Sequence, residues 1–398
     1  MTTSFAMELS PEIKTLYDDM VLWRRHIHAH PEVGLECHRT AAMVADHLTD
    51  LGMKNIRTGV GVSGVVADIP GSGGDDRVLL LRADMDALPM LEEARVPYQS
   101  TIPGVMHACG HDAHTAILMG VATLLSRRKH PFPGTVRLMF QPGEEGHNGA
   151  MRMIRDGAMD SPVPTASLGL HVWNEMPAGT VYAEAGPVMA SADMFSFTIH
   201  GKGGHGAIPH FSIDPIVVAA QVINQLQTIV SRSIDPQQPA VVTIGTIQAG
   251  TAPNIIPASV ECSGTIRSFD PAVRDRMIDD MQRILKGICD AADARYEFSL
   301  TEGYPATVND SQMTDLVRRS VADVMGESAL VQHRPTMGAE DMSYILQRAP
   351  GAFFFVGSAP EGKEAFPHHH PEFDIDERVM AYGAAIFMKA AERFFYSP

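Results

Sequence analysis

The chain is poor in cysteine and in positive charge, and it has no long apolar segment. Four cysteines among 398 residues are too few for a disulfide scaffold. The 47 acidic residues outnumber the 31 lysine and arginine residues, and the net charge of −16 argues against a nucleic-acid or anionic-membrane partner. No run approaches the roughly 18 apolar residues of a membrane-spanning helix. These absences favour a soluble protein that binds neither nucleic acid nor membrane.

Residues 1–8 also lack the basic stretch and the apolar core of a signal peptide. Without a leader and without a disulfide framework, a reducing cytoplasm fits the sequence best. In that compartment a cysteine remains available as a thiolate metal ligand. The sequence therefore predicts a cytoplasmic protein.

The length of the chain and the order of its apolar segments predict two domains. Towards both ends, short apolar runs typical of buried parallel strands alternate with helical segments, which predicts an α/β domain with a mainly parallel sheet. The predicted strands are residues 64–69, 78–81, 136–140, 168–172 and 352–356. The first predicted helix begins at Pro11 and ends before Pro31. The other predicted helices cover residues 38–51, 113–125 and 379–394.

The middle of the chain follows a different order. A strand, a helix, two strands, a helix and a last strand form the β-α-β-β-α-β pattern of a ferredoxin-like domain. These segments are residues 194–200, 215–231, 240–247, 260–267, 272–291 and 296–300. The sequence thus predicts a catalytic α/β domain in two parts, 1–188 and 306–398, with an inserted domain over 189–305.

Potential metal ligands gather in one dense segment and recur at three later places. Cys109 and His111 are separated by a single glycine and lie directly before a predicted helix. The later ligands are Glu144 and Glu145 after a predicted strand, His171 within another, and His368, His369 and His370 near the C-terminus. Thiolate, imidazole and carboxylate are ligands of zinc-like divalent ions. There are more of them than one closed structural site needs, which predicts a catalytic metal centre with two ions.

Two pairs of acids follow predicted strands. Of Glu144 and Glu145, one can bind metal while the other handles protons, because adjacent side chains at a strand end point in different directions. Asp84 and Asp86 end another strand, two residues apart and on the same side. A buried acid at that point can orient a metal-binding histidine.

The inserted domain carries polar side chains in two glycine-rich loops and at a strand end. His205 lies in the loop 201–207, Asn254 lies in the loop 250–257, and Arg267 closes a predicted strand. Imidazole, amide and guanidinium together suit a carboxylate or an oxyanion. Taken singly, each of the three is a weak signal.

Together these motifs resemble the aminoacylase, hippurate hydrolase and auxin-conjugate hydrolase branch of the di-metal aminoacylase–carboxypeptidase superfamily. The resemblance extends from residues 25–32 to residues 369–373. Its specific strings are Cys-Gly-His-Asp-Ala-His at 109–114 and Gly-Glu-Glu-Gly at 143–146. Other parts of the superfamily have His-x-Asp at a strand end, whereas Asp-Met-Asp at 84–86 is typical of the acylase branch.

The resemblance implies a metal-dependent amidohydrolase that cleaves the amide bond of N-acyl-amino acids with metal-activated water. Glu144 would be the general base, and Asp86 would support the metal site. The implied ligands of two divalent ions (zinc, manganese, nickel or cobalt) are Cys109, His111, Glu145, His171 and His369, with His370 as the alternative to His369.

The resemblance also implies roles for the inserted domain, as a lid and as a dimerisation domain. His205, Asn254 and Arg267 would contact the substrate carboxylate or the tetrahedral oxyanion. His205 and Asn254 would reach in from the partner subunit of a homodimer. The loop Gly-Ala-Glu-Asp at 338–341 would support the site.

Three other interpretations remain open. The chain could be a dipeptidase or carboxypeptidase of the same superfamily. It could be a cysteine amidase in which Cys109 acts with His111 or His114, since a helix start can lower a thiol pKa. That reading leaves Glu145, His171 and the late histidines without a purpose. It could also be a non-catalytic metal-binding module, although every ligand and base position is filled.

Overall fold

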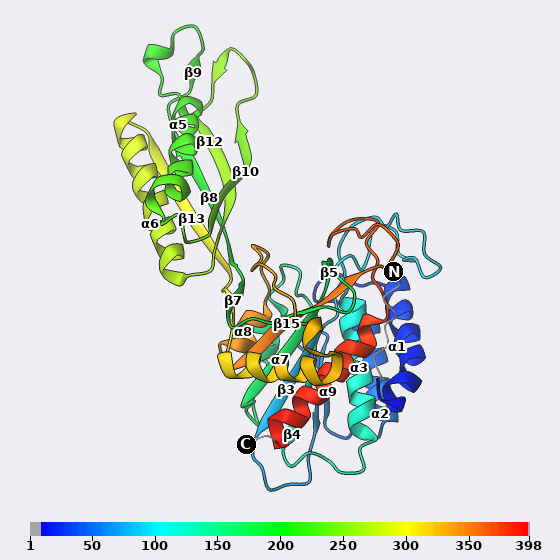
Figure 1. Cartoon of the computed structure of the whole chain (residues 1–398). Coiled ribbons are helices and arrows are strands. Elements are labelled where there is room, and N and C mark those ends of the chain that lie inside the picture. Colours follow the sequence, from blue (N-terminus) through cyan, green and yellow to red (C-terminus); the bar gives the residue numbers. More distant parts are fainter. Residues whose placement is uncertain (1–8, 397–398) are drawn as a thin grey trace. The chain divides into compact units, whose positions relative to one another are not determined.

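The computed structural model describes residues 9–396, which divide into two compact units (Figure 1). Among the described residues, the first unit comprises residues 9–188, Val308–Arg334 and residues 341–396, and the second comprises Met189–Thr307 and Pro335–Glu340. The chain passes between the units in β7 (Gly186–Met189) and β14 (Thr307–Asn309), and again before Pro335 and after Glu340. The segment 1–8, from which no leader is predicted, lies outside the described residues.

A seven-stranded sheet forms the centre of the first unit, in the order β1-β2-β4-β3-β5-β15-β6. The strands are β1 (Ile56–Val60), β2 (Gly64–Ile69), β3 (Val78–Asp84), β4 (Thr135–Gln141), β5 (Ala166–Pro177), β6 (Val181–Tyr182) and β15 (Gly351–Ala359). The four neighbours β4, β3, β5 and β15 run parallel to one another. Their residues are almost all buried, as expected for strands covered on both faces. This confirms the mainly parallel sheet predicted from the apolar runs.

One predicted strand has the opposite direction. Residues 64–69 are predicted as a parallel strand, whereas β2 pairs antiparallel with both β1 and β4. A short turn over residues 61–63 joins β1 to β2, and such a turn can connect only antiparallel neighbours. The apolar content of a strand reports its burial and not its direction, so the sequence pattern could not distinguish the two cases.

Helices pack against the sheet. In the first unit α1, α3, α9 and α7 pack side by side in that order, and α3, α9 and α7 also contact strands (Figure 1). The helices of this unit are α1 (Pro11–Ala29), α2 (His38–Asp50), α3 (His111–Ser126), α4 (Gly149–Arg155), α7 (Ser311–Met325), η3 (Glu327–Ala329), α8 (Met342–Leu346) and α9 (Val379–Tyr396). Across residues 9–396, no helix combines the length and the apolarity that a bilayer crossing requires.

The first helix carries a buried charged cluster that apolar periodicity does not predict. The guanidinium of Arg24 is fully buried and donates to Asp112 (2.9 Å) and Asp374 (2.9 Å). His28, one turn further along α1, contacts the carboxylates of Asp112 (2.8 Å) and Glu92 (3.0 Å) through its two ring nitrogens. The cluster therefore ties α1 to the start of α3 and to two loops.

This cluster predicts a pH-dependent contribution of His28 to stability. Burial alone lowers the pKa of His28, but the Asp112 and Glu92 carboxylates outweigh burial and raise that pKa above 6.5. A histidine whose pKa is higher in the folded than in the unfolded protein stabilises the fold fully at pH values below its unfolded-state pKa. This stabilisation is lost as the pH rises through the folded-state pKa. His28→Gln should therefore destabilise the protein by about 3 kcal/mol at pH below 6.5, and by less at alkaline pH. Thermal melts across pH, with the exposed His26→Gln as control, measure this difference, and a pH-independent loss would contradict it.

The second unit has the predicted ferredoxin-like order. Its sheet is antiparallel, with strand order β10-β12-β8-β13, and α5 and α6 pack together and against it. The elements are β8 (Ser191–His200), β9 (Gly204–His205), η1 (Pro209–Phe211), α5 (Pro215–Thr228), η2 (Ile229–Ser233), β10 (Ala240–Ala249), β11 (Ile255–Ile256), β12 (Ser259–Ser268), α6 (Pro271–Ala291) and β13 (Arg295–Tyr304). The short strands β9 and β11 pair outside this sheet.

Candidate metal centre

The candidate ligands of the first unit meet at the carboxyl ends of its parallel strands. Asp84 is the last residue of β3, and Glu144 and Glu145 follow the end of β4. His171 lies within β5, and His111 is the first residue of α3. In an open α/β sheet, ligands bind beyond the carboxyl ends of the strands. The topology thus brings residues from Asp84 to His171 into one site.

Cys109 belongs to two groups of potential ligand atoms. In one group the atoms of Cys109, His111 and His171 lie within 4.8 Å of one another, and in the other those of Cys109, Glu145 and His369 do. The Cys109 sulfur lies 3.5 Å from Nε2 of His171. A residue common to two ligand groups can serve two neighbouring ions. The donor atoms are sulfur, nitrogen and oxygen, a mixture that suits borderline divalent ions.

Unpaired buried atoms support a cation at this place. Nε2 of His111 and Oε1 of Glu145 are buried, and neither has a hydrogen-bond partner within the described part of the chain. Oε1 of Glu145 does lie 3.1 Å from Nε2 of His369, but the two are not aligned for a hydrogen bond. Leaving such atoms unsatisfied costs about 1–3 kcal/mol each. The residues present therefore fit a bound metal ion.

Of the three late histidines, His369 is the one that belongs to a group of potential ligand atoms, whereas the ring of His368 packs against His171 with centroids 5.1 Å apart. Its backbone has φ of 63°, in the left-handed region, and its N–H donates to the carbonyl of Ala108 (2.8 Å). His370 instead accepts from the N–H of Glu372 (3.1 Å). His368 accepts from the N–H of Asn174 (3.3 Å). The contiguous sequence could not separate His369 from His370, because their directions depend on the backbone of this loop.

Asp86 supports the site through two different groups. Its carboxylate accepts the backbone N–H groups of Glu144 (3.0 Å) and Glu145 (3.1 Å). Its backbone carbonyl lies 2.9 Å from Nδ1 of His111, which leaves Nε2 of that ring for a metal. The sequence predicts that an acid here orients a histidine. In the structure the carbonyl has that role, and the carboxylate holds the turn that carries both glutamates.

Glu144 is buried beside the ligand groups. Its carboxylate lies within one group of potential ligand atoms together with His111 and Glu145. Because Asp86 fixes its backbone, the side chain is held next to the predicted metal position. A carboxylate placed in this way can exchange protons with a water bound there.

Asp84 and His114 also lie close to His111, but their hydrogen bonds are already used. One carboxylate oxygen of Asp84 binds Nδ1 of His114 (2.6 Å), and the other accepts from Arg82 (2.7 Å). Nε2 of His114 accepts the N–H of Val172 (2.9 Å). Both ring nitrogens of His114 are therefore engaged, and each oxygen of Asp84 has a partner. Asp84, His111 and His114 nevertheless form a further group of potential ligand atoms, in which the Asp84 carboxylate could still contact a cation. Asp84 is a buried acid that holds His114 and Arg82.

Arg82 and Asp341 extend this buried network, and neither is identified as such by the sequence reading. Arg82 donates to Asp341 (3.0 Å), which also accepts from the Gln141 amide and from the N–H of Ala150 (2.8 Å). Asp341 thus holds the start of α4, a concrete form of the support predicted for the loop 338–341. An arginine in the middle of an otherwise apolar strand was the signal that could have revealed this network.

The protonation of the site disfavours a cysteine nucleophile. Burial raises the pKa of the Cys109 thiol, and the Glu145 carboxylate adds to this effect. A nucleophilic thiol needs a lowered pKa, and His114 has no nitrogen left to act as its base. Burial lowers the pKa of His171 well below 6.5, and the His114 and His368 imidazoles lower it further. The ring of His171 is therefore neutral, as a metal ligand must be.

The candidate residues of the second unit fall into two places. His205 in β9 pairs with Ile255 in β11, and the N–H of Gly206 donates to the carbonyl of Asn254 (2.9 Å), so His205 and Asn254 are neighbours on exposed loops. Arg267 lies near the far end of β12, eight residues after Ser259, or about 26 Å along an extended strand. Within one unit, Arg267 therefore lies apart from His205 and Asn254, so the three side chains do not meet in a single copy of the chain.

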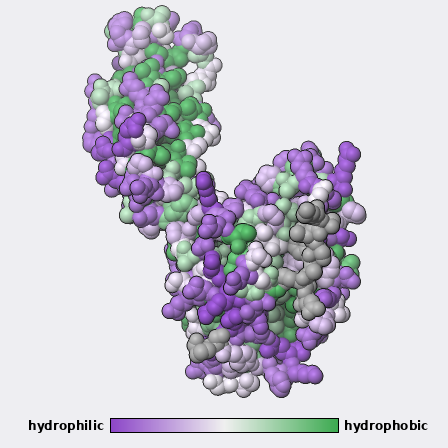
Figure 2. Space-filling view, viewed as in Figure 1, coloured by the Kyte–Doolittle hydropathy of each residue, from purple (hydrophilic) through white to green (hydrophobic). Residues whose placement is uncertain are grey.

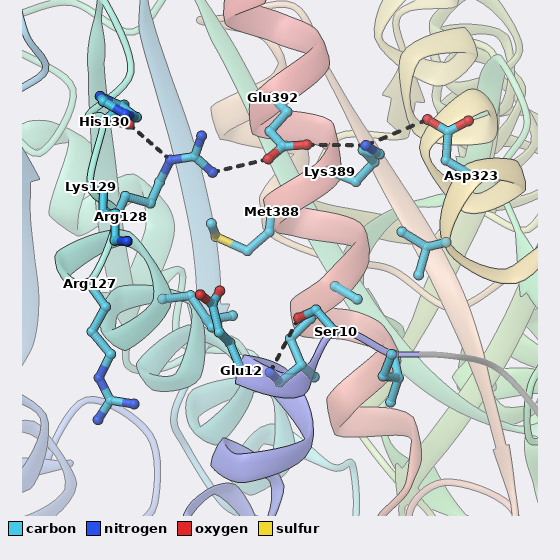
Figure 3. A pocket seen from close by; sticks show the side chains of 15 residues that line it. Ser10, Glu12, Arg127, Arg128, Lys129, His130, Asp323, Met388, Lys389 and Glu392 are labelled. Atoms are coloured by element: carbon cyan, nitrogen blue, oxygen red, sulfur yellow. Dashed lines mark hydrogen bonds and ion pairs between the residues drawn. The ribbon is translucent and has the colours of Figure 1, made fainter.

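A separate cavity of about 680 Å³ opens between α1, α3, α7 and α9 (Figure 3). None of the candidate ligands lines it. Some of its charged side chains pair with one another, as Arg128 does with Glu392 (3.0 Å) and Lys389 with Glu392 (3.2 Å). The cavity is therefore separate from the metal centre.

Known proteins are similar in sequence to this chain over nearly its whole length. YhaA of Bacillus subtilis (strain 168) is 42% identical over 386 residues, which cover 96% of each chain. Thermostable carboxypeptidase 2 of Saccharolobus solfataricus is 41% identical over 392 residues, which cover 97% of this chain and 98% of the relative. N-acetyl-L-cysteine deacetylase of Bacillus subtilis is 38% identical over 381 residues, which cover 96% and 89%.

Solved structures share the fold. A protein from methicillin-resistant Staphylococcus aureus superposes with a TM-score of 0.92 and 33% identity, covering 98% of this chain and 99% of the other. YXEP of Bacillus subtilis, described as a dinuclear metal-binding peptidase of the M20 family, superposes with a TM-score of 0.84 and 32% identity, covering 97% and 99%. The profile of Peptidase family M20/M25/M40 matches residues 80–393. With this match and these relatives, the chain belongs to peptidase family M20/M25/M40.

Proposed function

We propose that the protein is a di-metal amidohydrolase that cleaves the amide bond of N-acyl-amino acids. The observation that carries the proposal is the pair of ligand groups that share Cys109 beside the buried Glu144. The proposed ligands are Cys109, His111, Glu145, His171 and His369. Two further facts support it: one relative is named a deacetylase of N-acetyl-L-cysteine, and one related structure is described as binding two metals.

The chain's own residues would divide the chemistry. Divalent ions at these ligands would polarise the scissile carbonyl and acidify a water near neutral pH. Glu144 would take a proton from the attacking water and pass it to the leaving amine. Asp86 would keep Glu144 and Glu145 in place through their backbone N–H groups. His205 would donate to the oxyanion as it forms.

The second unit supports a homodimer in which this donor comes from the partner. β10 is an edge strand, and an apolar groove of about 310 Å³ runs between it and α5. Ile216 and Ile247, which line the groove, are 46% and 57% exposed, and apolar surface is visible over this region in Figure 2. An exposed apolar face beside an unpaired strand edge suits a second copy of the chain. Since one unit separates Arg267 from His205 and Asn254, a substrate contacting all three would require two copies.

Two finer points belong to the same proposal. The four cysteines are free and buried, which agrees with a cytoplasmic location. A dipeptidase or carboxypeptidase is the second candidate, because a relative at 41% identity is named a carboxypeptidase. Both activities use the same centre and differ in the group on the acyl side of the bond.

A hydrolysis panel distinguishes these activities. N-acetyl-, N-benzoyl- and indoleacetyl-amino acids and simple dipeptides would be offered to the metal-free protein and to protein reloaded with manganese, zinc, cobalt or nickel. We expect metal-restored release of the amino acid from at least one N-acyl substrate. Cleavage restricted to dipeptides would transfer the protein to the peptidases. Inactivity on every substrate, with two ions bound, would overturn the proposal in favour of a non-catalytic module.

A further inference from the structure

His114 occupies a position between the two segments that supply metal ligands. It lies in the first turn of α3, three residues after His111, and its side chain is 1% exposed. Nε2 of His114 accepts the backbone N–H of Val172 at 2.9 Å. Val172 directly follows the candidate ligand His171 in β5. The side chain thus links the Cys109–His111 segment to the strand that carries His171.

This hydrogen bond takes the place of a missing strand contact. The paired residues of β3 and β5 end at Arg82–Gly169, and β3 itself ends two residues later, at Asp84. Past the end of β3, β5 continues to Val172 and beyond without β3 alongside it. A buried backbone N–H still needs an acceptor. The imidazole of His114 supplies that acceptor to Val172, at the point where β5 carries His171.

The hydrogen bonds of its two ring nitrogens determine which nitrogen of His114 carries the proton. Since Nε2 accepts a hydrogen bond, the proton must reside on Nδ1, which donates to Asp84 (2.6 Å). Asp84 is itself held by the Arg82 guanidinium (2.7 Å), and the hydroxyl of Thr115 donates to its backbone carbonyl (2.8 Å). The ring is therefore fixed in both tautomer and orientation. A ring held in this way can hold the strand in turn.

The bond between His114 and Val172 affects the distance between the candidate ligands Cys109 and His171. Nε2 of His171 lies 3.5 Å from the Cys109 sulfur, and the rings of His114 and His171 are in contact with centroids 4.5 Å apart. If Val172 shifted, His171 would move relative to Cys109 and His111. Metal ions tolerate only small errors in ligand distance.

We propose that His114 is a positioning residue that sets the place of His171 in the metal centre through its bond to the Val172 N–H. This inference rests on the proposed function, in that it requires a metal at His171. It assigns to the last histidine of the Cys-Gly-His-Asp-Ala-His string a role distinct from ligand, base or nucleophile.

Two substitutions separate the bonds of His114. In His114→Asn, the amide nitrogen falls near the position of Nδ1 and can still donate to Asp84, but the side chain is too short to accept from Val172. In His114→Gln, the amide oxygen reaches the region of Nε2 and can accept from Val172, while the contact with Asp84 is lost. The Gln variant is thus the matched control for the Asn variant.

The measurement is Zn²⁺ affinity by chelator competition, with Co²⁺ absorption in the thiolate charge-transfer region as a reporter of the Cys109 bond. We expect His114→Asn to bind Zn²⁺ about 10–100-fold more weakly, as for loss of other outer partners of metal ligands. His114→Gln should stay close to the wild type in affinity and in its Co²⁺ spectrum. Melting temperatures of the metal-free proteins report folding separately from binding.

Each outcome decides the matter. Wild-type affinity in His114→Asn would overturn the proposal, and so would an equal loss in both variants, because the Val172 bond would then not be what matters. If His114→Asn does not fold, His114→Gln still decides, since a loss of tenfold or more there contradicts the proposed role. A wild-type chain that binds no Zn²⁺ would overturn the proposed function first, and this role with it.

Discussion

Replacing Glu144 with glutamine should lower turnover by about 10²–10⁴-fold while leaving both metal ions bound. The substitution keeps the size and the polarity of the side chain but removes its ability to take a proton. The turn itself should survive, because Asp86 holds the backbone N–H of residue 144 and not its side chain. The measurement combines kcat on the best N-acyl substrate with metal content after dialysis.

The matched comparison for this variant is Glu145→Gln. Glu145 belongs to the ligand group with Cys109 and His369, so its substitution should reduce metal content as well as activity. The two variants would then differ in metal content: Glu144→Gln would retain its metal and Glu145→Gln would lose metal. Near-wild-type turnover in Glu144→Gln would remove that residue from the role of base, and metal loss in it would make Glu144 a ligand instead.

Replacing Cys109 with alanine should weaken the binding of both ions at once. Cys109 belongs to two of the ligand groups, the one with His111 and His171 and the one with Glu145 and His369, so its loss leaves each of these two groups with two donors. The loss of affinity should exceed the about 10–100-fold that is typical when only an outer partner is removed. Metal content by mass spectrometry, and the rise in melting temperature on adding Zn²⁺, would both report the change.

The control for the second prediction is Cys37→Ala. Cys37 is also a free, buried thiol, and burial raises its pKa, but it belongs to no ligand group among the described residues. Its sulfur contacts the carbonyl of Gly34 (3.2 Å). This variant should keep both ions. Retention of two tightly bound ions by Cys109→Ala would refute the shared-ligand arrangement.

The secondary structure could be predicted from sequence because its signals are local. Apolar runs marked the buried strands β3, β4, β5 and β15, and the Ser10-Pro11 pair marked the start of α1, where the Ser10 hydroxyl accepts the Ile13 N–H (3.4 Å). The direction of a strand, in contrast, is not encoded in the residues of that strand. It depended on the turn that joins β1 to β2, and the prediction for residues 64–69 was wrong for that reason.

The chemistry of the site could be predicted in kind but not in arrangement. The residue types at 109–111, 144–145 and 171 indicated a metal centre because few other functions need thiolate, imidazole and carboxylate together. The part played by the Asp86 carbonyl depends on where β3 ends. The exclusion of His114 as a ligand depends on a hydrogen bond to a strand 58 residues away in sequence.

The sequence by itself indicated the family, through the resemblance of its short strings, together with the order of the secondary-structure elements and the set of residue types available to a metal. These follow from composition, periodicity and short strings, which are properties of neighbouring residues. The tertiary structure alone decided which of His369 and His370 approaches Glu145, and it separated Arg267 from His205 and Asn254 along β12. It also decided that Arg24 and His28 would be buried together with acids. The reason is that distances between side chains remote in sequence are set by how strands and helices pack, and no local pattern encodes them.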